Sequence, residues 1–239
     1  MRKHLIILPI LILLSLKIVQ AETTELNEMN NTVLTLRQQA MVSIAATTAS
    51  GDLTHLKTSL SDALDAGLTI NEGKEILTQL YAYVGFPRVL NAIGVFMALI
   101  DQRKSQGIDD PLGALPNPMP ADKTALQLGS EVQTYLVGHP VTGKLFEFVP
   151  AIDQFLKAHL FGDIFGRDNL NYQDREIVTI SALAALKGLE SQLKAHVSIG
   201  LNIKLTEQQI IQIATVLKRD IGKVEGQRVL VALDANLNK

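Results

Sequence analysis

The feature that most constrains the fold of this chain is an internal repeat. When the sequence is shifted by 137 residues, the segment 51–85 aligns with 188–222 without a gap, and eleven of the 35 positions are identical. Unrelated sequences would share about two of these positions by chance. The similarity continues upstream with a shift of one residue, which places Arg37 opposite Arg175. The sequence therefore predicts two tandem copies of one unit, packed on each other about a pseudo-twofold axis.

The residue pattern within each unit is helical. Apolar residues recur at helical spacing from Val33 onwards, and no segment sustains the alternation typical of a β-strand. Thr69 followed by Glu72 predicts a capping box at a helix start, and Thr206 followed by Gln209 repeats it. We therefore predict an all-α fold. The expected helices span residues 37–50, 53–65, 71–83, 88–103, 124–137, 150–160, 207–219 and about 226–234, with two successive helical segments within 171–206.

The first 21 residues differ from the rest of the chain. Arg2 and Lys3 precede an apolar run from Leu5 to Leu16, and the small-x-small site at 19–21 follows. This order predicts a cleavable secretory signal peptide at 1–21 and a periplasmic or secreted protein. An uncleaved membrane anchor is the alternative, although the run is shorter than the roughly 20 apolar residues that span a bilayer.

The remaining chain divides into four parts on composition. A polar stretch, 22–32, is expected to be a flexible lead-in, and 33–105 is the first helical repeat. The segment 106–123 is rich in proline and glycine, which predicts a linker, and 124–239 is the second helical repeat. After cleavage of the signal peptide we expect no membrane contact.

Composition excludes several classes of site and partner. The formal net charge is −2 and no basic run is interleaved with aromatic residues, so we expect no nucleic-acid partner. The chain has no cysteine, which excludes disulfides, thiolate metal sites and thiol redox cycles. His139 and His159 do not pair with carboxylates at metal-ligand spacing, and no glycine loop could cradle phosphate. We therefore predict no metal and no cofactor.

Four short motifs suggest a family. In chain order they are YVGFPRVLN at 83–91, REIVTI at 175–180, LKAH at 193–196 and KLT at 204–206. Their order and spacing resemble the carboxymuconolactone decarboxylase family, whose fold is shared by the alkylhydroperoxidase D proteins. The resemblance covers both repeats, roughly 37–100 and 161–233. It implies an all-helical protein that forms a homo-oligomer and binds a small carboxylic acid or lactone.

The resemblance also shows what this chain lacks. The peroxidase branch of the family uses a C-x-x-C pair, a His four residues after the second Cys and an upstream Glu. Glu176 and His196 match that Glu and His, but Leu189 and Gln192 stand where the cysteines would be. The corresponding residues of the first repeat are Gln38, Asp52, His55 and Ser59. A thiol peroxidase needs a thiolate nucleophile, so that activity does not carry over.

His196 and Glu176 are the predicted catalytic residues. A carboxylate beside an imidazole orients the ring and favours its protonated form, which suits proton donation near neutral pH. A cofactor-free decarboxylation also needs a cationic group for the substrate carboxylate, which Arg175 or Arg88 could supply. Tyr83, Phe86 and Asn91 are the other candidate substrate-binding residues. Each of these side chains also has a structural interpretation, as a core, interface or ion-pair residue.

Two functions of different kinds remain open on these observations. The first is an exported, cofactor-free decarboxylase or lyase acting on a small lactone or carboxylic acid. The second is a non-catalytic protein of the same fold that binds such a molecule or acts as a scaffold, which the loss of half of each repeat's motif favours. An antioxidant role without a thiol is a third. The first predicts that His196 and Glu176 lie within hydrogen-bonding distance and face a hollow.

Overall fold

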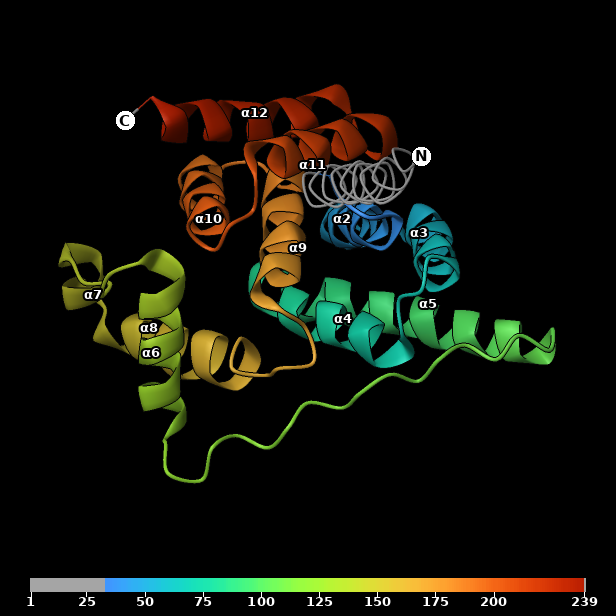
Figure 1. The fold of residues 1–239 in the computed structure, drawn as a ribbon, viewed down its shortest axis with the longest axis horizontal. Helices are drawn as coiled ribbons and strands as arrows, with labels where there is room; N and C mark the ends of the chain where they lie inside the picture. Colours follow the sequence, from blue (N-terminus) through green and yellow to red (C-terminus); the bar gives the residue numbers. More distant parts are fainter. Residues whose placement is uncertain (1–32, 239) are drawn as a thin grey trace, which may run out of the picture.

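The computed structural model describes residues 33–238 (Figure 1). The predicted signal peptide and the predicted lead-in both lie outside the described residues. Within 33–238 every regular element is a helix, which confirms the all-α prediction. No helix in this range combines the length and apolar character needed to cross a membrane.

The two predicted repeats have the same sequence of four helices. The first contains α2 (Leu36–Ser50), α3 (Leu53–Asp65), α4 (Ile70–Val84) and α5 (Phe86–Ser105). The second contains α9 (Tyr172–Ala185), α10 (Glu190–Asn202), α11 (Glu207–Asp220) and α12 (Lys223–Leu237). The starts of α3, α4 and α5 each precede their counterparts by 137 residues, which is the shift found in the sequence. Gly51 and Gly188 end the first helices at equivalent turns, with φ of +80° and +79°.

The helices α2 and α9 form the centre of the molecule. They pack on each other, and Figure 1 shows the other helices of the two repeats arranged around them. Residues 40–49 of α2 and 174–184 of α9 are buried on all sides, and both stretches are rich in Ala, Ser and Thr. Small side chains let two helix backbones approach closely, so the pair can serve as a shared core. The contacts of α4 with α9 and of α11 with α2 are equivalent, as a pseudo-twofold arrangement requires.

A different region separates the two repeats. Residues 106–124 run without a helix along one edge of the molecule (Figure 1), followed by α6 (Ala125–Val137), α7 (Lys144–Phe148) and α8 (Pro150–Phe155). A π-helix, η1 (Leu156–Ile164), continues α8. The helices α6 and η1 pack closely at Gly129. A Cβ at this position would lie 1.7 Å from the Lys157 carbonyl oxygen, so only glycine fits there. The sequence predicted a single helix at 150–160 and did not predict α7 or the change to π geometry.

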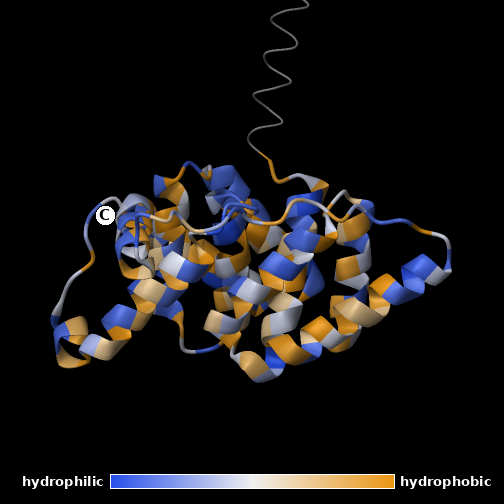
Figure 2. Ribbon diagram, turned by 90° about the horizontal axis from the view of Figure 1, so that it is seen from below, coloured by the Kyte–Doolittle hydropathy of each residue, from blue (hydrophilic) through white to orange (hydrophobic). Residues whose placement is uncertain are grey.

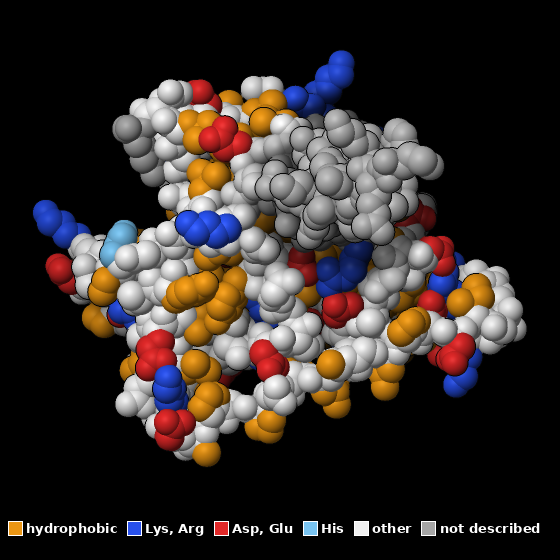
Figure 3. Space-filling model, viewed as in Figure 1, with side chains coloured by type: hydrophobic (Ala, Val, Ile, Leu, Met, Phe, Trp, Pro, Cys, Tyr) orange, Lys and Arg blue, Asp and Glu red, His pale blue; other side chains and the backbone are white. Residues whose placement is uncertain are grey.

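Local sequence accounts for where several helices begin. The predicted capping boxes at Thr69 and Thr206 are confirmed, and two more occur at Thr35 and Thr124. In each, the Thr hydroxyl accepts a hydrogen bond from a free backbone N–H of the first turn. On the face shown in Figure 3, acidic and basic side chains are interspersed, so no large area of a single charge covers it.

Candidate active site

The helices α9 and α10 bring Glu176 and His196 together. The Nδ1 atom of His196 lies 2.8 Å from Oε2 of Glu176, a hydrogen-bonding distance. The Glu176 side chain is fully buried, whereas the His196 side chain keeps 13% of its surface exposed. The Nε2 atom of His196 makes no hydrogen bond with any described residue. The pair therefore has a buried carboxylate that fixes the ring and a second ring nitrogen that is not engaged.

Tyr83, from the other repeat, lies beside this pair. Its ring meets the His196 ring edge-on, with 5.7 Å between the ring centroids. The Tyr83 hydroxyl and Oε1 of Glu176 are both buried, and neither has a hydrogen-bond partner among the described residues. Burial raises the pKa of Tyr83, and the nearby Glu176 carboxylate raises it further. The phenol therefore stays protonated and can act only as a hydrogen-bond donor or acceptor at neutral pH.

Arg175 is fully buried at the junction of the two repeats. Its guanidinium donates to Oε1 of Glu75 at 2.8 Å and to Oε1 of Gln79 at 3.0 Å, both on α4. It also donates to the Arg167 carbonyl at 2.7 Å and lies 5.6 Å from the centroid of the Phe165 ring. Burial lowers the pKa of Arg175, and the Glu75 carboxylate counteracts that effect. The cation of Arg175 is thus paired within the protein and joins α9 to α4.

The three remaining candidates lie on α5. Phe86 is 61% exposed and stacks on Tyr81, with 4.6 Å between the ring centroids. Arg88 is exposed and donates to the Val84 carbonyl at 3.3 Å, and Asn91 is also exposed. Of the residues predicted to bind substrate, Tyr83 is the one that contacts the His196 ring. The roles predicted for all five remain predictions.

Comparison with known proteins identifies the family. The model of the carboxymuconolactone decarboxylase family matches residues 19–98 and 150–224, which together make up more than half of the chain. The chain belongs to the carboxymuconolactone decarboxylase family. The two matched regions fall on the two repeats, which confirms the tandem arrangement inferred from the sequence. No curated protein sequence matches the chain.

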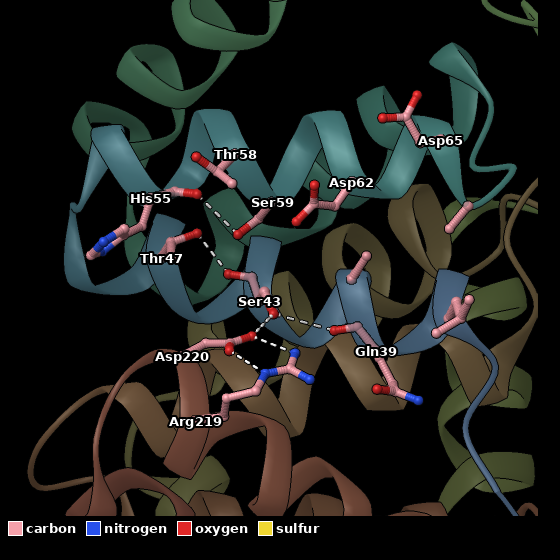
Figure 4. Close-up of a pocket in the computed structure, with 13 residues that line it drawn as sticks. Gln39, Ser43, Thr47, His55, Thr58, Ser59, Asp62, Asp65, Arg219 and Asp220 are labelled. Atoms are coloured by element: carbon pink, nitrogen blue, oxygen red, sulfur yellow. Dashed lines mark hydrogen bonds and ion pairs between the residues drawn. The ribbon is translucent and has the colours of Figure 1, made fainter.

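This member of the family has a large hollow in its first repeat. It lies between α2, α3 and the end of α11 and has a volume of about 790 Å³ (Figure 4). Ser59, which occupies the place of His196, lines it together with His55. Asp220, from the second repeat, also lines the hollow, and it accepts a hydrogen bond from Ser43 at 2.5 Å. Its counterpart Tyr83 lies in the same way beside His196, in the repeat to which Tyr83 does not belong. The hollow is therefore the first-repeat counterpart of the Glu176–His196 site.

The hollow lies apart from the predicted catalytic pair. Hollows of about 680 Å³ between α10 and α12 and about 310 Å³ beside α10 are also present. Neither His196 nor Glu176 lines these hollows or the one in the first repeat. Sequence reasoning missed the first-repeat hollow because its lining comes from three helices of both repeats. The match of Asp220 to Tyr83 under the 137-residue shift was the signal that could have indicated it.

Proposed function

We propose that this protein is an exported, cofactor-free acid–base enzyme, a decarboxylase or lyase that acts on a small lactone or carboxylic acid. His196 is the proton donor in this proposal, and Glu176 orients it. The observation that carries the proposal is the 2.8 Å contact between His196 Nδ1 and Glu176 Oε2, which leaves Nε2 without a partner among the described residues. A ring held on one nitrogen by a buried carboxylate presents the other nitrogen in a fixed direction.

The chemistry follows from that geometry. When the substrate carboxylate leaves as CO₂, the electron pair of the broken C–C bond stays on the substrate carbon and spreads into the adjoining carbonyl. The Nε2–H of the imidazolium transfers its proton to that carbon, and the neutral ring recovers a proton from solvent. The Glu176 carboxylate stabilises the imidazolium before the transfer.

Two further groups fit roles in this reaction. The Tyr83 hydroxyl is protonated and unpartnered, so it can donate a hydrogen bond to the developing enolate oxygen. Arg175 is already paired with Glu75, so it contributes to the electrostatic field of the site and is not a free carboxylate clamp.

A specific observation favours a second candidate, a non-catalytic binding protein. The largest of the described hollows is in the first repeat, and the Glu176–His196 pair does not line it. Its walls carry hydroxyls and carboxylates, including those of Ser43, Ser59 and Asp62, which suit a small polar ligand. In this alternative the His–Glu pair is structural.

One experiment separates the two candidates. Small lactones and carboxylic acids are screened by thermal shift against the wild type, His196→Gln and Ser59→Phe, and each hit is assayed for CO₂ release. The enzymatic proposal expects a hit that releases CO₂ with the wild type and with Ser59→Phe, and turnover lost in His196→Gln. A hit that binds His196→Gln unchanged, is lost in Ser59→Phe and is never turned over would replace it with the binding proposal.

A further inference from the structure

The helix α5 has apolar residues on two opposite faces. Its inner face packs into the core through Val89, Ala92, Phe96 and Leu99, all of which are buried. Its outer face carries Phe86, Leu90 and Met97, which are 61%, 61% and 66% exposed. Figure 2 shows hydrophobic residues along this helix at the lower edge of the molecule. A surface helix normally has one apolar face, so a second, contiguous one indicates a surface that another molecule covers.

The equivalent helix of the second repeat does not carry apolar residues at the same three positions. At the spacing of 137 residues that relates the helix starts, Phe86, Leu90 and Met97 correspond to Lys223, Gln227 and Asp234. The exposed apolar residues of α12 lie at other positions: Val224, Val231 and Leu237 are 60%, 59% and 48% exposed. The shared fold therefore does not require apolar residues at these positions, and their presence on α5 needs a separate cause.

Gly94 lies at the centre of the outer face. A Cβ placed on it would meet no atom within 4 Å, and its φ is not positive, so neither packing nor backbone conformation within the chain requires glycine. Glycine weakens a helix interior, so its presence there carries a cost in stability. Glycine does allow the backbone of a second helix to approach closely.

The outer face is complementary to itself when a second α5 runs antiparallel across Gly94. The residue four before Gly94, Leu90, then faces the residue four after it, Ala98, so a large side chain meets a small one. In the same way Asn91 faces Met97, and Gly94 faces its own copy. Such a pairing is isologous, which is the form of a twofold homodimer interface.

Charge supports the same orientation. Asp101 lies on the outer face seven residues after Gly94, about 10 Å along the helix. It is exposed, and its carboxylate makes no hydrogen bond or ion pair with any described residue. Antiparallel pairing brings it to Pro87 of the other copy, at a helix start whose N-cap, Gly85, has no capping side chain. A carboxylate is favoured at the positive end of a helix, and Arg88 of the other copy adds a cation there.

We propose that the outer face of α5 is the interface of a homodimer, in which two copies of α5 pack antiparallel about a twofold axis at Gly94. This assigns a role to Phe86 and Asn91, which are both exposed. The proposal is independent of the proposed activity, because the His196 site lies on α9, α10 and the end of α4.

Sedimentation equilibrium of the chain purified after expression of the full-length sequence tests the association. The wild type is expected at twice its chain mass. Gly94→Leu, which should strengthen the helix itself but blocks close approach, and Met97→Glu are each expected to raise the dimer dissociation constant about 100-fold or more. Val231→Glu, at the position of α12 equivalent to Gly94, is the matched control and is expected to leave the dimer intact. Circular dichroism verifies folding of each variant.

Cysteine cross-linking tests the orientation, because the chain has no cysteine of its own. Gly94→Cys is expected to form a disulfide dimer under mild oxidation, whereas Thr215→Cys, exposed on α11, is not. Leu90→Cys mixed with Ala98→Cys is expected to give the mixed disulfide in preference to either self-pair. A wild type that is monomeric at every concentration, or a dimer that survives Gly94→Leu and does not cross-link through Gly94→Cys, would overturn the proposal.

Discussion

The two repeats share their helices but differ in what lies between their first two helices. In the second repeat, His196 on α10 contacts Glu176 on α9, and Tyr83 closes the site from the other repeat. In the first repeat, Ser59 takes the place of His196, Asp220 takes the place of Tyr83, and a hollow of about 790 Å³ opens. The duplicated backbone therefore sets where the two equivalent places lie, and a few side chains decide whether that place holds a hydrogen-bonded His–Glu pair or a cavity.

The same contrast appears in the buried charges. Arg175 of the second repeat is fully buried between Glu75 and Gln79, while its counterpart Arg37 keeps 23% of its side chain exposed and bonds to Asp174. The arginine of one repeat has thus become part of the junction core, and that of the other remains near the surface.

The largest expected effect is on the free energy of unfolding, when each of the two arginines is replaced in turn. Arg175→Met leaves the Glu75 carboxylate buried with only Arg167 as a cationic partner, so we expect a loss of about 3–5 kcal/mol in the free energy of unfolding. Arg37→Met is the matched control, with an expected loss of about 1 kcal/mol. Arg37 is partly solvated, and its buried partner Asp174 keeps hydrogen bonds from Gln38 and Asn171 when the guanidinium is removed. Urea denaturation followed by circular dichroism measures both. Equal losses in the two variants would contradict the claim that buried Arg175 stabilises the fold more than Arg37 does.

The next prediction compares His196 with Ser59, which occupies the equivalent position in the first repeat. His196→Gln removes the proton donor of the proposed reaction while keeping a polar side chain of similar size, so the proposal expects kcat for CO₂ release to fall about 100-fold or more. Ser59→Ala, at the equivalent position, should leave kcat within about twofold. Single-turnover assays with any substrate found by the screen make the measurement. A comparable loss in both variants would point to a general effect on folding.

A smaller effect is expected from Tyr83. Tyr83→Phe deletes a buried hydroxyl that has no partner among the described residues, so the free energy of unfolding should stay the same or rise by up to about 1 kcal/mol. If that hydroxyl assists the reaction, kcat should fall about tenfold while KM changes little. A variant that loses both stability and activity would show that the hydroxyl has a structural partner, such as a buried water.

The smallest effect is expected on stability, from a substitution of Asp220, the counterpart of Tyr83. Burial alone would raise the pKa of Asp220, but hydrogen bonds from Arg219 and Ser43 outweigh it and lower the pKa. A carboxyl with a lowered folded pKa stabilises the protein above its ordinary pKa and loses that contribution as pH falls through the folded value. Asp220→Asn should therefore cost under about 1 kcal/mol at pH 7. Melting curves should show this difference shrinking below about pH 4, and a difference that grows on acidification would contradict the assignment.

Much of the fold was predictable from the sequence. The helix α3 and the start of α11 follow from cap signals and from the repeat, and the family follows from four short motifs. Helix ends were less accurate: α5 begins at Phe86, two residues before its predicted start, because Pro87 fits the first helical turn. The π-helix η1 was missed because it depends on the close fit of Gly129 and Gly162 against opposing backbone, which periodicity does not record.

By itself, the sequence determined the helices and the duplication, because capping, apolar spacing and repeated residues can be recognised along the chain. The resemblance to the family, and not these patterns, indicated that Glu176 and His196 would pair. Tertiary structure alone decided that Tyr83 and Asp220 cross into the opposite repeat, that Arg175 is neutralised by Glu75 and that α5 keeps an uncovered apolar face. These outcomes depend on how helices from distant parts of the chain pack, and packing fixes burial and charge partners that no local pattern specifies.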